Sequence, residues 1–146
     1  MEKIYKIPEI KISMVREAPT IVLRSPTDAE SAVRHLCCQN PSTESFAILY
    51  LDGQSRLIAG RVAAMGGASS LSIRASEVFQ GAVNAGATAI ILGHNHPSGN
   101  PRPSPEDLAM TKKLVEAAEI IGIPIVDHVI VTEQTGSYSF LDHGDM

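Results

Sequence analysis

The residues best suited to chemistry lie in one segment, Gly93 to Asp107. His94 and His96 follow an apolar run and are two residues apart, so in extended chain their imidazoles point to the same side. Asp107 falls in the first turn of an expected helix, and a proline-stiffened loop returns its carboxylate to the end of that run. Two histidines and one carboxylate leave a fourth tetrahedral position for water, as in catalytic zinc sites. The segment therefore predicts a metal site with His94, His96 and Asp107 as ligands.

A purely structural interpretation also accounts for part of this segment. Ser104, Pro105 and Asp107 form a typical helix start, with a capping serine and a proline at the first helical position. Isolated His-x-His pairs also arise by chance. The cap and the metal site are compatible, and the combination favours a ligand site, because α/β sheets bind ligands where strands end and helices begin.

The complete spacing resembles a known signature. The pattern HxHx7SxxD of the JAMM metalloproteases, in the JAB/MPN superfamily, is matched by His94, His96, Ser104 and Asp107. One residue separates the two histidines, seven separate His96 from Ser104, and two separate Ser104 from Asp107. All four fixed positions agree. The resemblance implies a mixed β-sheet flanked by helices, in a three-layer arrangement like that of cytidine deaminases.

Three further sequence segments are similar to the RadC branch of this superfamily. They are His-Asn-His-Pro-Ser-Gly at 94–99, the preceding Ala-Ile-Ile-Leu-Gly, and Val-Asp-His-Val-Ile at 126–130. The likeness extends from about Pro19 to the C-terminus. RadC-like proteins often carry a helix-hairpin-helix segment before this domain, and we expect none within these 146 residues. The expected absence of this segment weakens the case for carrying a DNA-related role of RadC-like proteins over to this chain.

The resemblance implies a zinc-dependent hydrolase that cleaves an amide or isopeptide bond. Zn²⁺ would be held by the two histidines, Asp107 and a water, and Ser104 would donate a hydrogen bond to the developing oxyanion. Such enzymes also use an upstream glutamate as general acid/base. Glu44 is the best match, because it opens an early apolar run. Glu77 is the competitor, although a carboxylate in a first helical turn is also explained by the helix dipole.

The remaining histidines and the cysteines carry weaker signals. His128 matches a RadC-like position and is expected either beside a metal ligand or as a buried, hydrogen-bonded histidine. His35 and His143 have no partner pattern, so we expect surface residues. Cys37 and Cys38 are adjacent, and neighbours in sequence cannot close a useful disulfide loop. A half-buried helix position explains them better than a redox or metal role.

The sequence excludes two other functions and leaves a third open. An HNH nuclease spreads its motif over a ββα unit, so the contiguous His94-Asn95-His96 does not qualify. A zinc nucleobase deaminase needs His-x-Glu and Pro-Cys-x-x-Cys, and neither occurs. The alternative that stays open is a non-enzymatic RadC-like module that acts as a binding partner in DNA repair or recombination.

The elements that must position these residues follow from periodicity and capping. Helices are expected over about Pro26–Gln39, Ala75–Ala85 and Pro105–Ile121. Strands are expected over Phe46–Leu51 and Leu57–Val62, as a hairpin, and over Ala87–Gly93, Ile125–Val131 and Tyr138–Leu141. Residues 1–18 form an N-terminal extension or an edge strand, and residues 19–146 form the single domain.

Composition agrees with an ordinary globular domain. Apolar residues make up 44% and charged residues 19% of 146, which excludes disorder as the main state. The longest apolar run is far short of the ~20 residues that span a bilayer, and no signal peptide is apparent, so we expect a cytoplasmic protein without membrane association. The formal charge of −4 opposes general attraction to nucleic acid. A peptide or protein is one candidate substrate, but nothing in the loops distinguishes it from a ubiquitin-like tail or a small amide. The sequence also leaves an association with DNA and the oligomeric state open.

Overall fold

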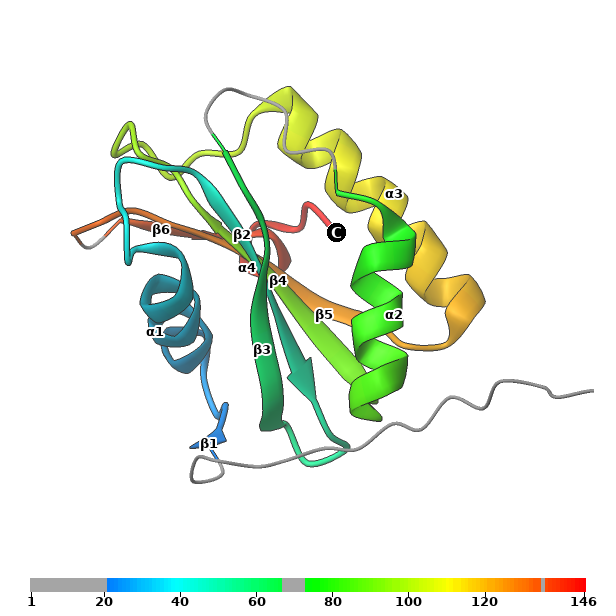
Figure 1. Cartoon of the computed structure of the whole chain (residues 1–146). Coiled ribbons are helices and arrows are strands. Elements are labelled where there is room, and N and C mark those ends of the chain that lie inside the picture. Colours follow the sequence, from blue (N-terminus) through cyan, green and yellow to red (C-terminus); the bar gives the residue numbers. More distant parts are fainter. Residues whose placement is uncertain (1–20, 67–72, 135) are drawn as a thin grey trace, which may run out of the picture.

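The structure, a computed structural model, describes residues 21–66, 73–134 and 136–146. The expected extension or edge strand at 1–18 lies outside these ranges. A six-stranded sheet has the order β1-β3-β2-β4-β5-β6 (Figure 1). Its strands are β1 Ile21–Val22, β2 Ser45–Leu51, β3 Arg56–Met65, β4 Ala89–Asn95, β5 Ile125–Val131 and β6 Ser137–Ser139. The helices are α1 Pro26–Cys37, α2 Ala75–Ala85, α3 Pro105–Ile121 and α4 Phe140–His143.

The molecule has three layers. α1 covers one face of the sheet, and α2 and α3 cover the other (Figure 1). Alternation along the buried central strand β2 supplies both cores: Phe46 and Ile48 pack with α2 and α3, whereas Ala47 and Leu49 pack with α1. β4 and β5 are parallel, and the other paired strands are antiparallel. The expected mixed sheet flanked by helices is confirmed.

Local capping sets the helix limits. Ser25 and Ser104 each form a capping box with the acidic residue three positions later. Gly86 and Gly122 end α2 and α3 in the left-handed conformation that glycine adopts without strain. α1 stops at Cys37, two residues before the predicted end, because Cys38 is its C-cap and makes the final helical bond, from its amide to the Arg34 carbonyl.

Cross-strand pairing moves two predicted strands. β4 begins at Ala89 because the amide of Ala87 still bonds to the end of α2, at the carbonyl of Ala82. It continues through His94 and Asn95, which pair with β5. β3 likewise extends beyond Val62 to Met65, where it pairs with the start of β2.

The predicted strand Tyr138–Leu141 is wrong in its second half. β6 ends at Ser139, and Phe140 begins the short helix α4. The Ser139 hydroxyl caps this helix by accepting from the amide of Asp142, and the Asp127 carboxylate accepts from the amide of Leu141. These tertiary and capping bonds turn the chain away from the sheet.

Candidate metal centre

His94 and His96 lie where β4 leaves the sheet. His94 pairs with Phe46 on one side and Ile130 on the other, and only 1% of it is exposed. The amide of His96 still donates to the Val131 carbonyl at 2.9 Å, which keeps the chain extended. Both imidazoles therefore point to the same side, as the spacing predicts, and their Nε2 atoms are 3.0 Å apart.

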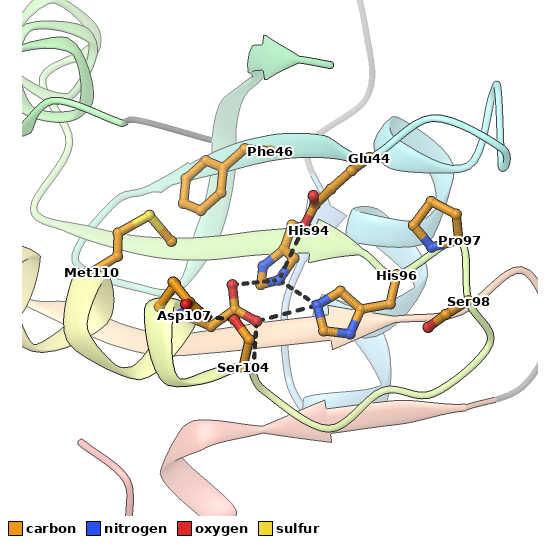
Figure 2. Close-up of a pocket in the computed structure, with 10 residues that line it drawn as sticks. Glu44, Phe46, His94, His96, Pro97, Ser98, Ser104, Asp107 and Met110 are labelled. Atoms are coloured by element: carbon orange, nitrogen blue, oxygen red, sulfur yellow. Dashed lines mark hydrogen bonds and ion pairs between the residues drawn. The ribbon is translucent and has the colours of Figure 1, made fainter. Parts of the chain in front are cut away.

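The carboxylate of Asp107 reaches the same point from α3. Its Oδ1 lies 3.4 Å from Nε2 of His94, and its Oδ2 lies 3.2 Å from Nε2 of His96. The capping box holds it there, because the amide of Ser104 donates to Oδ2 at 2.9 Å. Figure 2 shows the three side chains converging from the strand and the helix. One carboxylate thus takes part in both the helix cap and the cluster.

The spacing of these donors fits a small tetrahedral cation. Zinc–ligand bonds of about 2.0–2.1 Å at tetrahedral angles separate two ligand atoms by about 3.3–3.4 Å. The three separations here are 3.0, 3.4 and 3.2 Å. Imidazole nitrogen and carboxylate oxygen are both zinc ligands. We call the donor atoms of His94, His96 and Asp107 the candidate metal centre.

The charge of Asp107 suits this role. Burial opposes its ionisation, but the close contacts with the His94 and His96 rings outweigh burial and hold the pKa of the carboxyl well below its usual range. Burial also opposes protonation of His96, but hydrogen bonds to Asp107 and to the Asn100 carbonyl raise its pKa. The geometry thus offers a negative oxygen and two nitrogens to a shared cation.

The hydrogen of the neutral His96 ring is placed by Asn100. Nδ1 of His96 is 2.8 Å from the backbone carbonyl oxygen of Asn100. A carbonyl can only accept, so Nδ1 is the donor. The lone pair of the neutral ring is then on Nε2, which faces the candidate metal centre.

Glu44 approaches the centre from the chain just before β2. Its Oε1 lies 3.9 Å from Nε2 of His94, and its side chain is 17% exposed. One ligand atom from each of Glu44, His94, His96 and Asp107 lies within 4.8 Å of the other three. The structure therefore brings Glu44 to the three predicted ligands from a segment 50 residues upstream of His94.

Asn95 holds the backbone on both sides of Glu44. Its Oδ1 accepts from the amide of Ser45 at 2.7 Å, and its Nδ2 donates to the carbonyl of Thr43 at 3.0 Å. The side chain is buried, so these bonds satisfy its amide group away from water. Sequence reasoning missed this residue, although an amide side chain between two predicted ligands, at the end of a buried strand, is a signal that could have found it.

Ser104 and a cavity complete the site. The Ser104 Oγ accepts from the amide of Asp107 at 3.1 Å, which leaves its hydroxyl hydrogen available. A cavity of about 450 Å³ opens in front of the centre. Phe46, Pro97 and Met110 form its apolar wall (Figure 2).

The sequence was also compared with models of known protein families. A family model described as RadC-like JAB domain matches residues 23–145, which include every residue of the candidate metal centre. The chain belongs to the RadC-like JAB domain family. The RadC-like resemblance inferred from the sequence is therefore confirmed.

Several bacterial relatives of this RadC-like JAB domain are named UPF0758 protein. The one from Syntrophomonas wolfei is 44% identical over 115 residues, which are 77% of this chain and 49% of the relative. Those from Picosynechococcus and Rubrobacter xylanophilus are 41% and 37% identical, over 83% and 92% of this chain and 49% and 58% of the relatives. The chain thus spans about half the length of these relatives. Their names state no activity.

Glu77 lies away from the candidate metal centre of this RadC-like JAB domain. It is exposed in the first turn of α2, where its Oε2 accepts from the amide of Arg74 at 3.2 Å. The carboxylate therefore caps its own helix, which is the structural explanation weighed against a catalytic one. Of the two glutamates considered from the sequence, Glu44 is the one near the histidines.

The other histidines fall into two groups. His128 is fully buried, and its Nε2 lies 2.8 Å from Nδ1 of His94, so it is both hydrogen-bonded and next to a candidate ligand. His35 is exposed, as expected. His143 is also exposed, but it stacks on Tyr138 and its Nδ1 donates to the Ser139 carbonyl at 2.8 Å. It stabilises the end of the chain.

Two further expectations concern the rest of the molecule. Cys37 and Cys38 are free thiols, and burial of Cys37 against β2 raises its pKa to about 12. Cys37 therefore remains a protonated core residue at neutral pH. None of the helices within 21–66, 73–134 and 136–146 has the length and apolar character needed to cross a bilayer.

Proposed function

We propose that this chain is a zinc-dependent hydrolase that cleaves an amide or isopeptide bond. The observation that carries the proposal is the convergence of three donor groups at tetrahedral spacing, with Glu44 3.9 Å from one of them. His94, His96 and Asp107 would hold the ion. The cavity is lined by these three residues and by Glu44. A bound zinc ion would supply hydroxide at neutral pH by lowering the pKa of water from ~15.7 toward ~7.

Glu44 is suited to general acid/base work at this site. Its carboxylate is partly exposed to the cavity, close to the ligands but not fixed by the cap that holds Asp107. It would accept the proton of the attacking water and then give it to the leaving amine. Such proton transfer is typically worth ~10²–10⁴ in rate.

Ser104 is suited to stabilising the oxyanion. Its oxygen already accepts one amide hydrogen, so its own hydrogen can be donated into the cavity. A rigid donor beside the reacting carbonyl lowers the transition state more than the ground state. Ser104 would thus contribute a hydrogen bond at the point where negative charge develops.

The first experiment measures metal content by elemental mass spectrometry. We expect about one zinc per chain in the purified protein and none in a His94→Ala/His96→Ala double variant. Absence of zinc from the wild type, even after dialysis against zinc, would contradict the proposed site.

The second experiment tests turnover on a library of quenched peptides and isopeptides. Glu44→Gln should keep its zinc and lose ~10²–10⁴ in rate. Glu77→Gln is the matched control and should cleave like the wild type, because its carboxylate only caps α2. Zinc binding without cleavage of any substrate would favour the non-enzymatic binding module, and a salt-dependent affinity for DNA would then indicate its partner.

A further inference from the structure

A buried chain of hydrogen bonds lies behind the candidate metal centre. Nδ1 of His94 is 2.8 Å from Nε2 of His128, and Nδ1 of His128 is 2.6 Å from Oγ1 of Thr111. Oγ1 of Thr111 is in turn 2.7 Å from the backbone carbonyl oxygen of Asp107. His94, His128 and Thr111 are each 1% exposed or less, so water competes little for these bonds.

The donors and acceptors in this series of hydrogen bonds follow from its last acceptor, the backbone carbonyl of Asp107. A carbonyl oxygen only accepts, so Thr111 must donate its single hydroxyl hydrogen to Asp107. The same hydroxyl oxygen can then only accept from the ring of His128. Nδ1 of His128 is therefore the protonated nitrogen of that ring.

The surroundings of His128 keep its ring neutral. It stacks on Phe140, with ring centroids 4.5 Å apart, and meets the edge of Phe46 at 5.7 Å. No carboxylate of the described residues is hydrogen-bonded to this ring, and a cation enclosed in this way is costly, so the ring is neutral. With one hydrogen already on Nδ1, Nε2 of His128 is an acceptor. Nδ1 of His94 must then be the donor in the bond between the two rings.

We propose that Thr111 and His128 are positioning residues that hold His94 as the Nδ1–H tautomer, with its Nε2 lone pair directed at the candidate metal centre. This inference rests on the proposed function only in taking the cation to be zinc. The hydrogen bonds also return to their origin, because Asp107 supplies both the carbonyl that accepts the last of them and the carboxylate 3.4 Å from Nε2 of His94. Strand β4 and helix α3 are thereby fixed to each other at the site.

The wild type alone provides the first test. Two-bond ¹H–¹⁵N NMR correlations of the metal-free protein, recorded at mildly alkaline pH, report which ring nitrogen of each histidine carries hydrogen. We expect the Nδ1–H tautomer for both His94 and His128. An Nε2–H tautomer at His94 would overturn the proposal, and this measurement depends on no variant folding correctly.

Two substitutions of Thr111 provide the second test. Thr111→Val keeps the shape and removes the hydroxyl, so His128 and His94 should each show a mixture of tautomers, and zinc affinity should fall ~10–100-fold. Thr111→Ser should restore the single tautomer and most of the affinity. Thr132→Val is the control, because it removes another buried threonine hydroxyl that bonds to Gly136 rather than to the site.

The outcomes separate this proposal from the proposed function. Wild-type tautomers and wild-type zinc affinity in Thr111→Val would refute the role of Thr111 and leave the hydrolase proposal intact. The expected tautomers in a protein that binds no zinc would support the hydrogen-bond chain and refute the zinc hydrolase. Equal loss of affinity in Thr132→Val and Thr111→Val would show a general effect on stability and would also contradict the positioning role.

Discussion

The motif Ser-Pro-x-Asp occurs twice in this chain, at residues 25–28 and 104–107. Both copies form the same capping box, in which serine accepts from the aspartate amide and aspartate accepts from the serine amide. Only the second copy faces two histidines. At the scale of single residues, the chemistry of Asp107 and Ser104 therefore depends on their neighbours rather than on their local sequence.

This repetition allows a controlled test of Ser104. Ser25→Ala and Ser104→Ala should each lower the free energy of unfolding by ~0.5–2 kcal/mol, because each removes one helix cap. Only Ser104→Ala should also lower kcat, by ~10²–10³, since it removes an oxyanion donor. Denaturant titrations and steady-state kinetics measure the two effects. Equal kcat values in the two variants would refute an oxyanion role for Ser104.

Asn95 provides a second prediction at this scale. Asn95→Ala leaves the buried amide of Ser45 without its acceptor, which should cost ~1–3 kcal/mol of stability. Because the backbone around Glu44 loses its support, kcat should fall by up to ~10²-fold while zinc affinity changes little. Metal titration and kinetics on the same variant distinguish these quantities. A parallel loss of zinc would instead indicate that Asn95 supports the histidines.

At the scale of elements, the site depends on how closely α1 packs on β4. Gly93 precedes the first histidine, and a Cβ built there would lie 2.4 Å from Cγ2 of Val33. No real Cβ contact is that short, so the helix can approach the strand only because residue 93 has no side chain. This contact fixes the strand that carries His94.

Gly93→Ala should therefore destabilise the protein by ~1–3 kcal/mol through overpacking. Val33→Ala in the same chain should recover part of this loss, because it removes the two methyl groups that clash. A double-mutant cycle measured by chemical denaturation gives the coupling between the two positions. Strict additivity of the two substitutions would contradict the contact.

The buried thiol of α1 gives a pH prediction. The folded pKa of Cys37 is raised by burial to about 12, whereas an unfolded cysteine titrates near ~8.5. Above that pH the unfolded chain loses a proton that the native chain keeps, so stability falls as pH rises, by up to about 1.4 kcal/mol per pH unit. Unfolding curves at several alkaline pH values should show a shallower decline for Cys37→Ala. Identical slopes would mean that the thiol is not protected by the fold.

At the scale of the whole molecule, the candidate metal centre joins two elements across a loop. The ligands come from β4 and α3, but both hydrophobic cores form without the site, on the two faces of the sheet. The fold should therefore survive metal removal, and bound metal should add stability by mass action.

A chelator provides the corresponding test. At a free zinc concentration 100 times Kd, the free energy of unfolding should exceed that of the metal-free protein by ~2.7 kcal/mol. The metal-free protein should keep its far-UV circular dichroism and lose its activity. Unfolding of the domain on chelation would contradict this, since it would identify the metal as a structural staple.

Short-range signals explain what the sequence determined by itself. Caps, glycine stops and hydrophobic alternation act within about four residues, and they predicted all of α2 and α3, as well as β5, correctly. The spacing of His94, His96 and Asp107 also acts locally, through one strand end and one helix start. These elements suffice to predict a candidate ligand set and the family.

Other features were decided only by the tertiary structure. Three sets of contacts join residues 17 to 52 positions apart. They are the approach of Glu44 to His94, the hydrogen bonds of Asn95 to the backbone beside Glu44, and the bonds between Thr111, His128 and His94. Their contacts depend on which strands pair, in which register, and on how α3 packs across them. The tertiary structure also decides that Phe140 and Leu141 lie in α4 rather than in the predicted strand, because the Asp127 carboxylate on β5 accepts from the amide of Leu141. Such contacts produce no periodic pattern in the sequence, because each residue satisfies the local requirements of its own helix, strand or turn whether or not its distant partner is present.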